Sequence, residues 1–582
     1  MTVEKLIVDH IDTWTTALQT RSTAGRGSSG KIDLYGIKKL RELILELAVR
    51  GKLVPQDPND EPASELLKRI AAEKTELVKQ GKIKKQKPLP EISEEEKPFE
   101  LPVGWEWVTF SHLGHFFGGK TPSKMKDEYW GGTIPWVTPK DMKTNLIVDS
   151  EDKVTPLAIE DGLTKVSPGS ILFVARSGIL RRIFPVAITS IECTVNQDLK
   201  VLSPFLSEIS YYIRLMMNGF ERYIVENLTK TGTTVESLLF DDFISHPFMI
   251  PPFAEQNRIL STVKKLMSLC DQLEQHSLTS LDAHQQLVET LLTTLTDSQN
   301  ADELTENWAR ISEHFDTLFT TEASIDALKQ TILQLAVMGK LVPQDPNDEP
   351  ASELLKRIAQ EKAQLVKDGK IKKQKPLPPI SDEEKPFEIP TNWEWVRFGT
   401  ITTSRLGKML DKAKNKGTPK KYIRNVNVQW DNISIDDVNE MKFEDNELSE
   451  FILRNGDLLI CEGGEPGRCA IWNKPGEFYF QKALHRVRTF CNIPERILAI
   501  HLKNDSLNGR LANLFTGVTI KHLPGDKLQQ YVIPLMPLNE QTNIIEKLNF
   551  LLDICDSLSK EIKSSQQTQL HLADALTDAA IN

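Results

Sequence analysis

The stretch GKLVPQDPNDEPASELLKRIA, residues 51–71, recurs without change at residues 339–359, 288 positions further along the 582-residue chain. The surrounding match extends over residues 40–110 and 328–398, where 56 of 71 positions are identical. A repeat of this length indicates two copies of one structural unit, so both copies are expected to fold alike.

A second match, at an offset of 285, lies at the far end of each copy. It pairs Thr231-Gly232 with Thr516-Gly517, Pro252-x-x-Glu255-Gln256 with Pro537-x-x-Glu540-Gln541, and Cys270-Asp271 with Cys555-Asp556. Between the matched blocks lie two inserts, 103–252 and 391–537, whose sequences differ although their offsets drift by only three positions. This plan favours two equivalent attachment surfaces that carry two different recognition modules. A duplicated structural protein whose inserts simply diverged is the alternative.

The frames around the inserts are predicted to be helical. After each Glu-Gln pair, apolar residues follow a 4-3-4-3 spacing, which is the seam of a coiled coil; they are Ile259, Val263, Leu266, Cys270 and Leu273 in the first copy and Ile544, Leu548, Leu551, Cys555 and Leu558 in the second. The first helix is predicted over 255–296, a length of roughly 60 Å, although Ser277, Ser280 and His284 interrupt its seam. Shorter helices are predicted over 64–81 and 352–369, with Ser64 or Ser352 as N-cap and Gly81 or Gly369 as the stop.

The inserts show the pattern of mixed α/β modules with short strands. The segments 169–176 (GSILFVAR) and 456–463 (GDLLICEG) predict buried strands that begin after a glycine turn. The segments WEWVTF and WEWVRF alternate as a half-buried strand does.

Composition narrows the class of protein. The chain has no run of about 18 apolar residues, so no membrane contact is expected, and its N-terminus lacks the pattern of a signal peptide. The six cysteines are far apart, which predicts reduced thiols in the cytoplasm and no zinc site. The net charge of −10 mildly disfavours nucleic-acid binding but does not exclude it, because binding depends on local patches.

The segment GHFFGGKTPS, residues 114–123, fits the phosphate-binding P-loop pattern letter for letter. A P-loop needs its Lys and Thr in the first turn of a helix, whereas Pro122 disfavours a helical conformation at Thr121. In the second copy Gly114 becomes Thr402 and Thr121 becomes Met409, while Gly119-Lys120 persists as Gly407-Lys408. The copies therefore share a Gly-Lys turn rather than a nucleotide site.

A second near match is IPPF, residues 250–253. Adenine methyltransferases have a polar residue at its first position, and Ile250 cannot accept the hydrogen bond that such a residue makes. The other copy has lost the motif, and we find no complete catalytic constellation elsewhere. We therefore predict no catalytic residues, no metal site and no cofactor in this chain.

Both inserts hold basic and aromatic residues typical of nucleic-acid contacts. In the second insert, Asn425, Asn427 and Gln429 alternate as on one face of a strand and are candidates for reading adenine edges. The first insert adds three arginines after a buried strand, and Arg181 aligns with Arg468. The candidate DNA-binding residues are Lys120, Thr121, Ser123, Lys124, Lys140, Arg176, Arg181, Arg182, Thr231, Gly232 and Thr233, followed by Lys408, Lys420, Lys421, Arg424, Asn425, Asn427, Arg468, Thr516 and Gly517.

Each candidate also has a structural interpretation. A lysine run is usually a solvated loop, tryptophans in strands usually lie in a core, and Arg181 and Arg468 could be structural ion pairs. The case for nucleic acid depends on basic, aromatic and Gly-turn features recurring in both inserts.

These features resemble the specificity subunits of type I restriction-modification enzymes over nearly the whole chain. The segments that carry the resemblance are residues 118–142 with GGKTPS and YWGGTIPWVTPKDM, the TGTTV and TGVTI turns, and the P-x-x-EQ helix starts with their seam helices. The repeated block GKLVPQDPNDEPASELLKRI is similar to the EcoAI-like group, type IB.

The resemblance implies a mixed α/β fold, with two α/β target recognition domains joined by long antiparallel coiled-coil helices in an internal pseudo-two-fold repeat. It implies that each domain recognises one half of a bipartite site in double-stranded DNA, that the helices set the spacer, and that two methyltransferase subunits dock on the frames and bring restriction subunits with them. The docking helices are those of Ile259, Val263, Leu266, Leu273, Ile544, Leu548, Leu551 and Leu558. S-adenosylmethionine, ATP and Mg²⁺ would belong to the partner subunits. A coiled-coil scaffold without a DNA role and a nucleotide-hydrolysing enzyme are the alternatives.

The expected division of the chain follows the repeat. It comprises an N-terminal extension with a flexible linker (1–39), a helical region (40–102), the first target recognition domain (103–252), a central helical spacer (253–390), the second target recognition domain (391–537) and a C-terminal helix (538–582).

Overall fold

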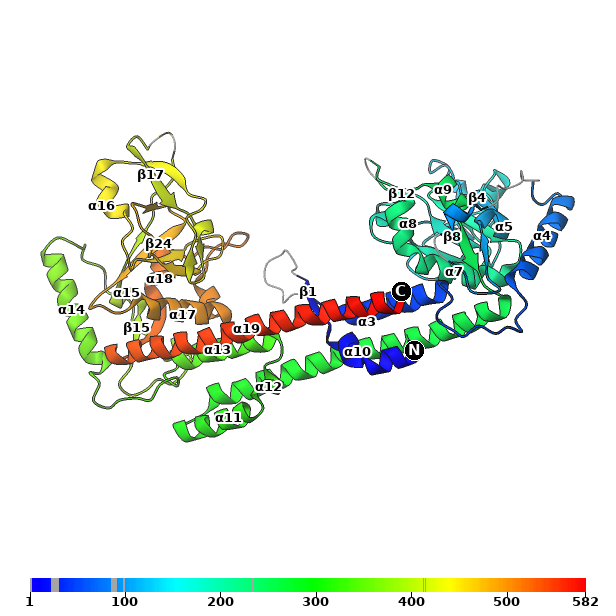
Figure 1. The fold of residues 1–582 in the computed structure, drawn as a ribbon. Coiled ribbons are helices and arrows are strands. Elements are labelled where there is room, and N and C mark those ends of the chain that lie inside the picture. Colours follow the sequence, from blue (N-terminus) through cyan, green and yellow to red (C-terminus); the bar gives the residue numbers. More distant parts are fainter. Residues whose placement is uncertain are drawn as a thin grey trace. The chain divides into compact units, whose positions relative to one another are not determined.

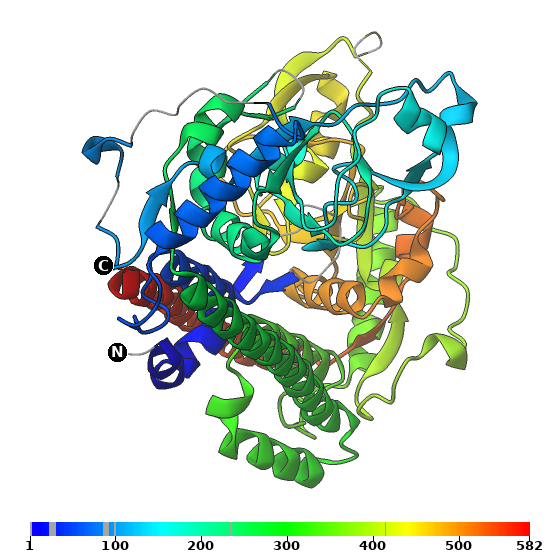
Figure 2. The ribbon, with the colours of Figure 1, turned by 90° about the vertical axis from the view of Figure 1, so that its right-hand side faces the viewer.

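The structure, a computed structural model, describes residues 3–21, 31–84, 92–97, 100–232, 235–411, 413 and 415–581. The chain divides into two compact units, unit 1 with Met1–Thr279 and Ser565–Asn582, and unit 2 with Ser280–Ser564. Two long helices belong to both units: α10 (Phe253–Asp297) begins in unit 1 and ends in unit 2, and α19 (Leu538–Ile581) begins in unit 2 and ends in unit 1. Both are continuous (Figures 1 and 2). The prediction for 255–296 is therefore confirmed, and the polar residues at 277, 280 and 284 do not break the helix.

In each unit a shorter helix contacts the long helices. In unit 2, Ile544, Leu548 and Cys555 share a buried cluster with Leu328 and Ile332 of α13 (Glu322–Val337). In unit 1, α3 (Tyr35–Val49) is joined to α10 by Arg41, which donates to Asp271 and Glu274 at 2.7 and 2.8 Å. Tyr35 on α3 donates to Asp574 of α19 at 2.7 Å. The seam of unit 2 is therefore buried within that unit, and in unit 1 polar contacts join α3 to both long helices.

The repeated block forms α4 (Ala63–Lys79) and α14 (Ala351–Lys367). The predicted N-caps Ser64 and Ser352 are wrong, because each helix starts one residue earlier, after a proline. Backbone carbonyls replace the side-chain cap: Ala63 N donates to Gly104 O at 2.8 Å, and Ala351 N donates to Asn392 O at 2.9 Å. The predicted stops are confirmed, since Gly81 and Gly369 have φ of 70° and 69°, values that favour glycine.

The insert of unit 1 is a mixed α/β domain. Its five-stranded sheet has the order β4-β11-β8-β9-β6, a three-stranded sheet has the order β10-β5-β7, and β3 pairs with β14. The strands are β3 (Glu106–Val108), β4 (Gly114–Gly118), β5 (Trp130–Val137), β6 (Leu146–Ile147), β7 (Asp152–Val154), β8 (Ile171–Val174), β9 (Val186–Thr189), β10 (Thr194–Val195), β11 (Leu199–Pro204) and β14 (Phe248–Ile250). The helices are α5 (Phe110–Leu113), α6 (Pro156–Glu160), α7 (Ser210–Gly219), α8 (Glu221–Asn227) and α9 (Phe240–Ser245).

The insert of unit 2 has the same plan with different sequences. Its main sheet has the order β16-β24-β21-β22, a second sheet has the order β20-β17-β23, and β15 pairs with β25. The strands are β15 (Glu394–Arg397), β16 (Thr402–Leu406), β17 (Thr418–Ile423), β18 (Val428–Gln429), β19 (Asn432–Ile433), β20 (Asn439–Phe443), β21 (Leu458–Cys461), β22 (Cys469–Ile471), β23 (Tyr479–Phe480), β24 (Leu484–Thr489) and β25 (Val532–Leu535). The helices are α15 (Phe398–Ile401), α16 (Leu448–Phe451), α17 (Glu495–Leu507) and α18 (Gly525–Gln530). The mixed α/β prediction is confirmed.

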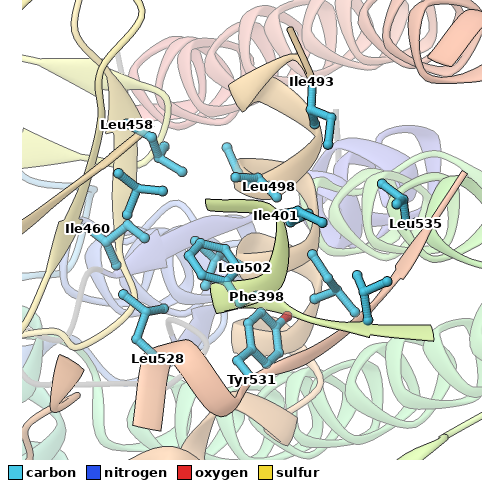
Figure 3. Packing of buried hydrophobic residues seen from close by; sticks show 14 of the residues in the cluster. Phe398, Ile401, Leu458, Ile460, Ile493, Leu498, Leu502, Leu528, Tyr531 and Leu535 are labelled. Atoms are coloured by element: carbon cyan, nitrogen blue, oxygen red, sulfur yellow. The ribbon is translucent and has the colours of Figure 1, made fainter. Parts of the chain in front are cut away.

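The predicted buried strands lie at the centre of each main sheet. All four residues of β8 and of β21 are buried. In unit 2, Leu458 and Ile460 of β21 point toward Phe398, Leu498 and Leu502 from neighbouring helices (Figure 3). Because alternate residues of a strand face opposite sides of a sheet, full burial means that both faces of these sheets are covered.

A buried glutamate ties each insert to the start of its long helix. In unit 1, Glu255 accepts hydrogen bonds from Trp105 Nε1 at 3.0 Å and from Gln56 Nε2 at 2.8 Å. In unit 2, Glu540 accepts from Trp393 and Gln344 in the same way. Burial raises the pKa of both carboxyls, and the donated hydrogen bonds oppose that rise. The repeated PQDP block and the WEW motif therefore fix where each insert leaves the frame.

All six cysteines are free thiols, and five of them are buried. Within the described ranges, no group of three or more His, Cys, Asp or Glu residues is arranged to hold a metal ion. None of the helices in those ranges is long and apolar enough to cross a membrane.

Candidate nucleic-acid interface

Backbone hydrogen bonds join several turns that follow strands of unit 1. Lys120 N, after β4, donates to Val195 O at 3.1 Å, and Asn196 N, after β10, donates to Val137 O at 2.9 Å. Ala175 N, after β8, donates to Asp198 O at 2.8 Å, and Ser177 N donates to Glu236 O at 3.1 Å. We call the described residues 119–120, 138–141, 175–178, 195–198, 231–232 and 235–237 the turn platform of unit 1.

Unit 2 has the equivalent turn platform, residues 407–408, 424–427, 462–465, 480–483 and 516–522. Here Lys408 N donates to Phe480 O at 3.1 Å, and Gln481 N donates to Ile423 O at 3.1 Å. Glu462 N donates to Ala483 O at 2.9 Å. Three of the four backbone bonds of unit 1 thus recur at equivalent positions of unit 2, although few of the side chains are the same.

The glycines shared by the two inserts are required for this backbone approach. A Cβ on Gly119 would lie 2.1 Å from Val195 O, and a Cβ on Gly407 would lie 2.1 Å from Gln481 O. In the Thr-Gly turns, a Cβ on Gly232 would lie 2.3 Å, and a Cβ on Gly517 2.2 Å, from the carbonyl oxygen three residues later. The Gly-Lys and Thr-Gly pairs therefore recur because side chains other than hydrogen do not fit.

The P-loop geometry is not formed at residues 114–121. Gly114 is the first residue of strand β4, and residues 119–126 form a loop rather than a helix. Gly119 packs against the carbonyl oxygens of Val195 and Asn196, so the turn is occupied by its own chain. A phosphate cradle at a helix N-terminus has no counterpart in this turn.

Most predicted DNA-binding residues of unit 1 lie on or beside its turn platform. Lys140 lies on the turn after β5, and Trp136 of that strand donates to Lys120 O at 3.1 Å. The exposed candidates are Lys120, Ser123, Lys124, Lys140, Arg176, Arg181, Arg182, Thr231 and Gly232; Thr121 is half-buried. Thr233 lies outside the described residues. Two of the exposed cations, Arg176 and Arg181, are also ion-paired, with Asp198 and Glu236.

The comparisons with known proteins agree with this two-fold construction. Residues 102–283 and 390–565 each match the model of the type I restriction modification DNA specificity domain. The EcoAI specificity subunit of type I restriction enzymes, from Escherichia coli, is 51% identical over 613 aligned residues that cover all of both chains. The chain belongs to the type I DNA specificity subunits. The EcoEI specificity subunit, also from Escherichia coli, is 48% identical with the same full coverage, and the EcoR124I/EcoR124II subunit is 36% identical over 29% of this chain and 42% of its own.

In unit 2 of this specificity subunit, four predicted DNA-binding cations are used inside the fold. Lys408 is 8% exposed and pairs with Glu444 and Glu447, and it holds the pKa of Glu444 down to about 2. Burial alone would lower the pKa of Lys408, but the two carboxylates raise it overall. The prediction that Lys408 contacts DNA is therefore wrong.

The other three cations are held by partners that the sequence did not reveal. Lys420 pairs with Glu477 at 2.6 Å, and Arg424 pairs with Asp437 at 2.8 Å. Arg468 is 14% exposed and donates to Glu465 and to Asn425 O. For Arg468 the structural alternative is the correct one.

The predicted strand face of Asn425, Asn427 and Gln429 is also wrong. Residues Asn425–Asn427 form a 3-10 turn, and Asn427 is buried, where it accepts from Arg424 N at 2.9 Å. The same turn occurs in unit 1, where Asp141 accepts from Thr138 N at 2.8 Å. The alternation came from turn capping rather than from a strand, so Asn427 is not available to DNA bases.

The remaining candidates of unit 2, Lys421, Thr516 and Gly517, are exposed. The sequence prediction missed two exposed lysines. Lys482 lies in the turn 480–483, and Lys521 lies in the Thr-Gly turn 516–522. It also missed Val518, which is fully exposed at the tip of the Thr-Gly turn. The constant offset of 285 between 195–198 and 480–483 was the available signal, but these turns share no residue type at any of their four positions.

The seam residues of the specificity subunit are not themselves a docking surface. Ile259, Val263, Leu266, Ile544 and Leu548 are buried within the chain. Leu273, Leu551 and Leu558 are half-buried, and the last two pack against the buried cluster of unit 2. These side chains stabilise the frames, so a partner that docks on the two helices would contact their other, exposed faces. Phe550 and Ile554, one helical turn apart on α19, are 60% and 42% exposed instead.

Proposed function

We propose that this specificity subunit binds double-stranded DNA at an asymmetric two-part site, with residues 103–252 contacting one half and residues 391–537 the other. The observation that carries the proposal is the turn platform, in which three equivalent backbone bonds recur in both units while the exposed side chains differ. A fixed backbone with variable side chains suits recognition of two different base sequences. The net charge of −10 is compatible with this role if partner subunits supply further phosphate contacts.

The long helices are proposed to set the distance between the two half-sites. At 1.5 Å per residue, the 45 residues of α10 span roughly 65 Å, which exceeds the ~34 Å between half-sites one DNA turn apart. Two methyltransferase subunits dock on the helical frames in the cytoplasm, with Phe550 and Ile554 as an exposed apolar contact on α19. Methyl transfer from S-adenosylmethionine and ATP- and Mg²⁺-dependent cleavage belong to those methyltransferase subunits and to restriction subunits.

Replacement of residues 103–252 by the corresponding insert of another specificity subunit tests the proposal. Methylome sequencing of cells that carry the chimaera is expected to show one changed half-site and one unchanged half-site. An unchanged two-part site would contradict the proposal and favour the coiled-coil scaffold.

A four-residue insertion in α10 beside the exposed Leu278 tests the role of the helices. The insertion lengthens the helix by ~6 Å, so the spacer between half-sites should change or activity should be lost. The matched control is a four-residue insertion between the exposed Pro475 and Gly476, which should leave the spacer unaltered. An unaltered spacer and full activity for the α10 variant would refute the ruler role.

A further inference from the structure

Two arginines are held in the same way: Arg176 on the turn platform of unit 1, and Arg181 at the end of the adjoining 3-10 turn, Gly178–Arg181. Arg176 donates from Nε to Asp198 Oδ1 at 2.8 Å, and Arg181 donates from Nε to Glu236 Oε1 at 2.6 Å. Their side chains are still 55% and 67% exposed. Among the described residues, none accepts a hydrogen bond from an Nη atom of either arginine. Each guanidinium is therefore anchored at its inner edge and open at its outer edge.

The carboxylates that hold these arginines are themselves fixed. Glu236 has a side chain that is 4% exposed, and its backbone carbonyl accepts from Ser177 N at 3.1 Å. Asp198 accepts from Asn196 Nδ2 at 3.2 Å, and its backbone N donates to Asn196 Oδ1 at 3.1 Å. Asn196 is buried. The orientation of both guanidinium groups is thus set before any ligand arrives, which reduces the entropy lost on binding.

The chemistry of this arrangement favours a base edge over a phosphate. A guanidinium held through Nε still presents two parallel Nη donors, which match the O6 and N7 acceptors of guanine in the major groove. An adjacent carboxylate repels a phosphate and offsets the cation that would attract it. A neutral acceptor pair is affected much less by that carboxylate, so the paired arginines suit guanine. Arg182, which has no ion-pair partner among the described residues, suits the DNA backbone.

The equivalent arginine of unit 2 is built differently. Arg468 uses Nη1 for Glu465 and Nη2 for Asn425 O, and it is 14% exposed. Its fork is directed into the fold, so only unit 1 has this arrangement at this position. The two platforms therefore differ in base chemistry as well as in sequence.

We propose that Arg176 and Arg181 each donate two Nη hydrogen bonds to a guanine in the half-site bound by unit 1, with Asp198 and Glu236 as positioning residues. This inference rests on the proposed DNA-recognition function and adds the base type and the residues that read it.

The inference is tested by selecting bound duplexes from a DNA library that is randomised over both half-sites. The protein used is the full chain in complex with its methyltransferase subunits. The variants are Arg181→Lys, Arg176→Lys and the control Arg182→Lys. Lysine keeps the charge and can still pair with the carboxylate but has no fork. Each of the first two variants should lose preference at one guanine position by roughly five- to a hundred-fold, and the control should keep it. Preferences in the other half-site should persist in all variants, which also reports that the assembly is folded.

A second probe uses selected duplexes in which that guanine is replaced by 7-deazaguanine, which lacks the N7 acceptor. Wild-type binding should weaken, and binding by the corresponding lysine variant should change little further. If the lysine variants instead bound every sequence more weakly by the same factor, the arginines would contact phosphates and the inference would be overturned. Selection of a half-site without guanine by unit 1 would also overturn it, while leaving the proposed function intact. Selection of no sequence at all would instead refute the proposed function.

Discussion

Gly119→Ala tests the turn platform directly. The new Cβ would lie 2.1 Å from Val195 O and 2.2 Å from Asn196 O, so the Gly-Lys turn must move away by about 1 Å to restore ordinary contact distances. That movement breaks the 3.1 Å hydrogen bond from Lys120 N to Val195 O. Loss of the bond costs about 1 kcal/mol, and the strain of overpacking adds about 1–3 kcal/mol. We expect unit 1 to lose about 2–3 kcal/mol after the small gain that alanine brings by restricting the unfolded chain.

Hydrogen exchange measured by mass spectrometry resolves this loss within the full chain. Peptides that cover β4 and β10 should exchange ~30-fold faster or more, if they open by local unfolding at equilibrium. Peptides of unit 2 should not change. The matched control is Gly118→Ala, where the nearest atom, at 3.3 Å, is the flexible end of Lys200. Equal exchange in the Gly118 and Gly119 variants would refute the argument that the Gly-Lys pair recurs for steric reasons.

Three further predictions concern unit 2. Lys408→Met should lower the free energy of unfolding by about 2 kcal/mol, because Glu444 and Glu447 lose a partner that is nearly buried. The control Lys421→Ala, at an exposed site, should leave that free energy unchanged. Urea midpoints of the two variants measure the difference, and equal midpoints would contradict the prediction. His501 is fully buried, and burial lowers its pKa to about 4, so the unfolded chain takes up its proton first and unit 2 should lose about 3 kcal/mol as the pH falls from about 6.5 to 4. His501→Asn should flatten the urea midpoint over that pH range, and an unchanged pH profile would exclude the histidine as its cause. Trp393→Phe removes one of the two hydrogen bonds to the buried Glu540 and should cost about 1–3 kcal/mol in the same urea assay, and no loss would show that the bond is dispensable.

The frames were predictable because their signals are local and written twice. Apolar spacing along 255–296 was sufficient to predict a helix whose observed bounds, Phe253–Asp297, differ by two residues at its start and one at its end. Glycine at 81 and 369 predicted the stops, because a helix end in the left-handed region favours that residue. The helix starts at Ala63 and Ala351 were missed, since their caps are backbone carbonyls 41 residues away in the chain.

Which basic residues are free to bind DNA could not be predicted in the same way. Lys408 and Lys120 follow the same glycine in the repeat, yet Lys408 pairs with Glu444 and Glu447, 36 and 39 residues later, and Lys120 is exposed. Arg468 and Arg181 also occupy equivalent positions, but one guanidinium points into the fold and the other is held outward by Glu236, 55 residues away.

The sequence by itself determined the two copies, the long helices, the central strands and the family of this chain. These depend on residue identity and on periodicity along the backbone. Only the tertiary structure decided which cations form buried ion pairs and which are exposed on or beside the turn platforms. The physical reason is that a charge is neutralised by whatever lies a few ångströms away in space, and those partners come from distant segments brought together by folding.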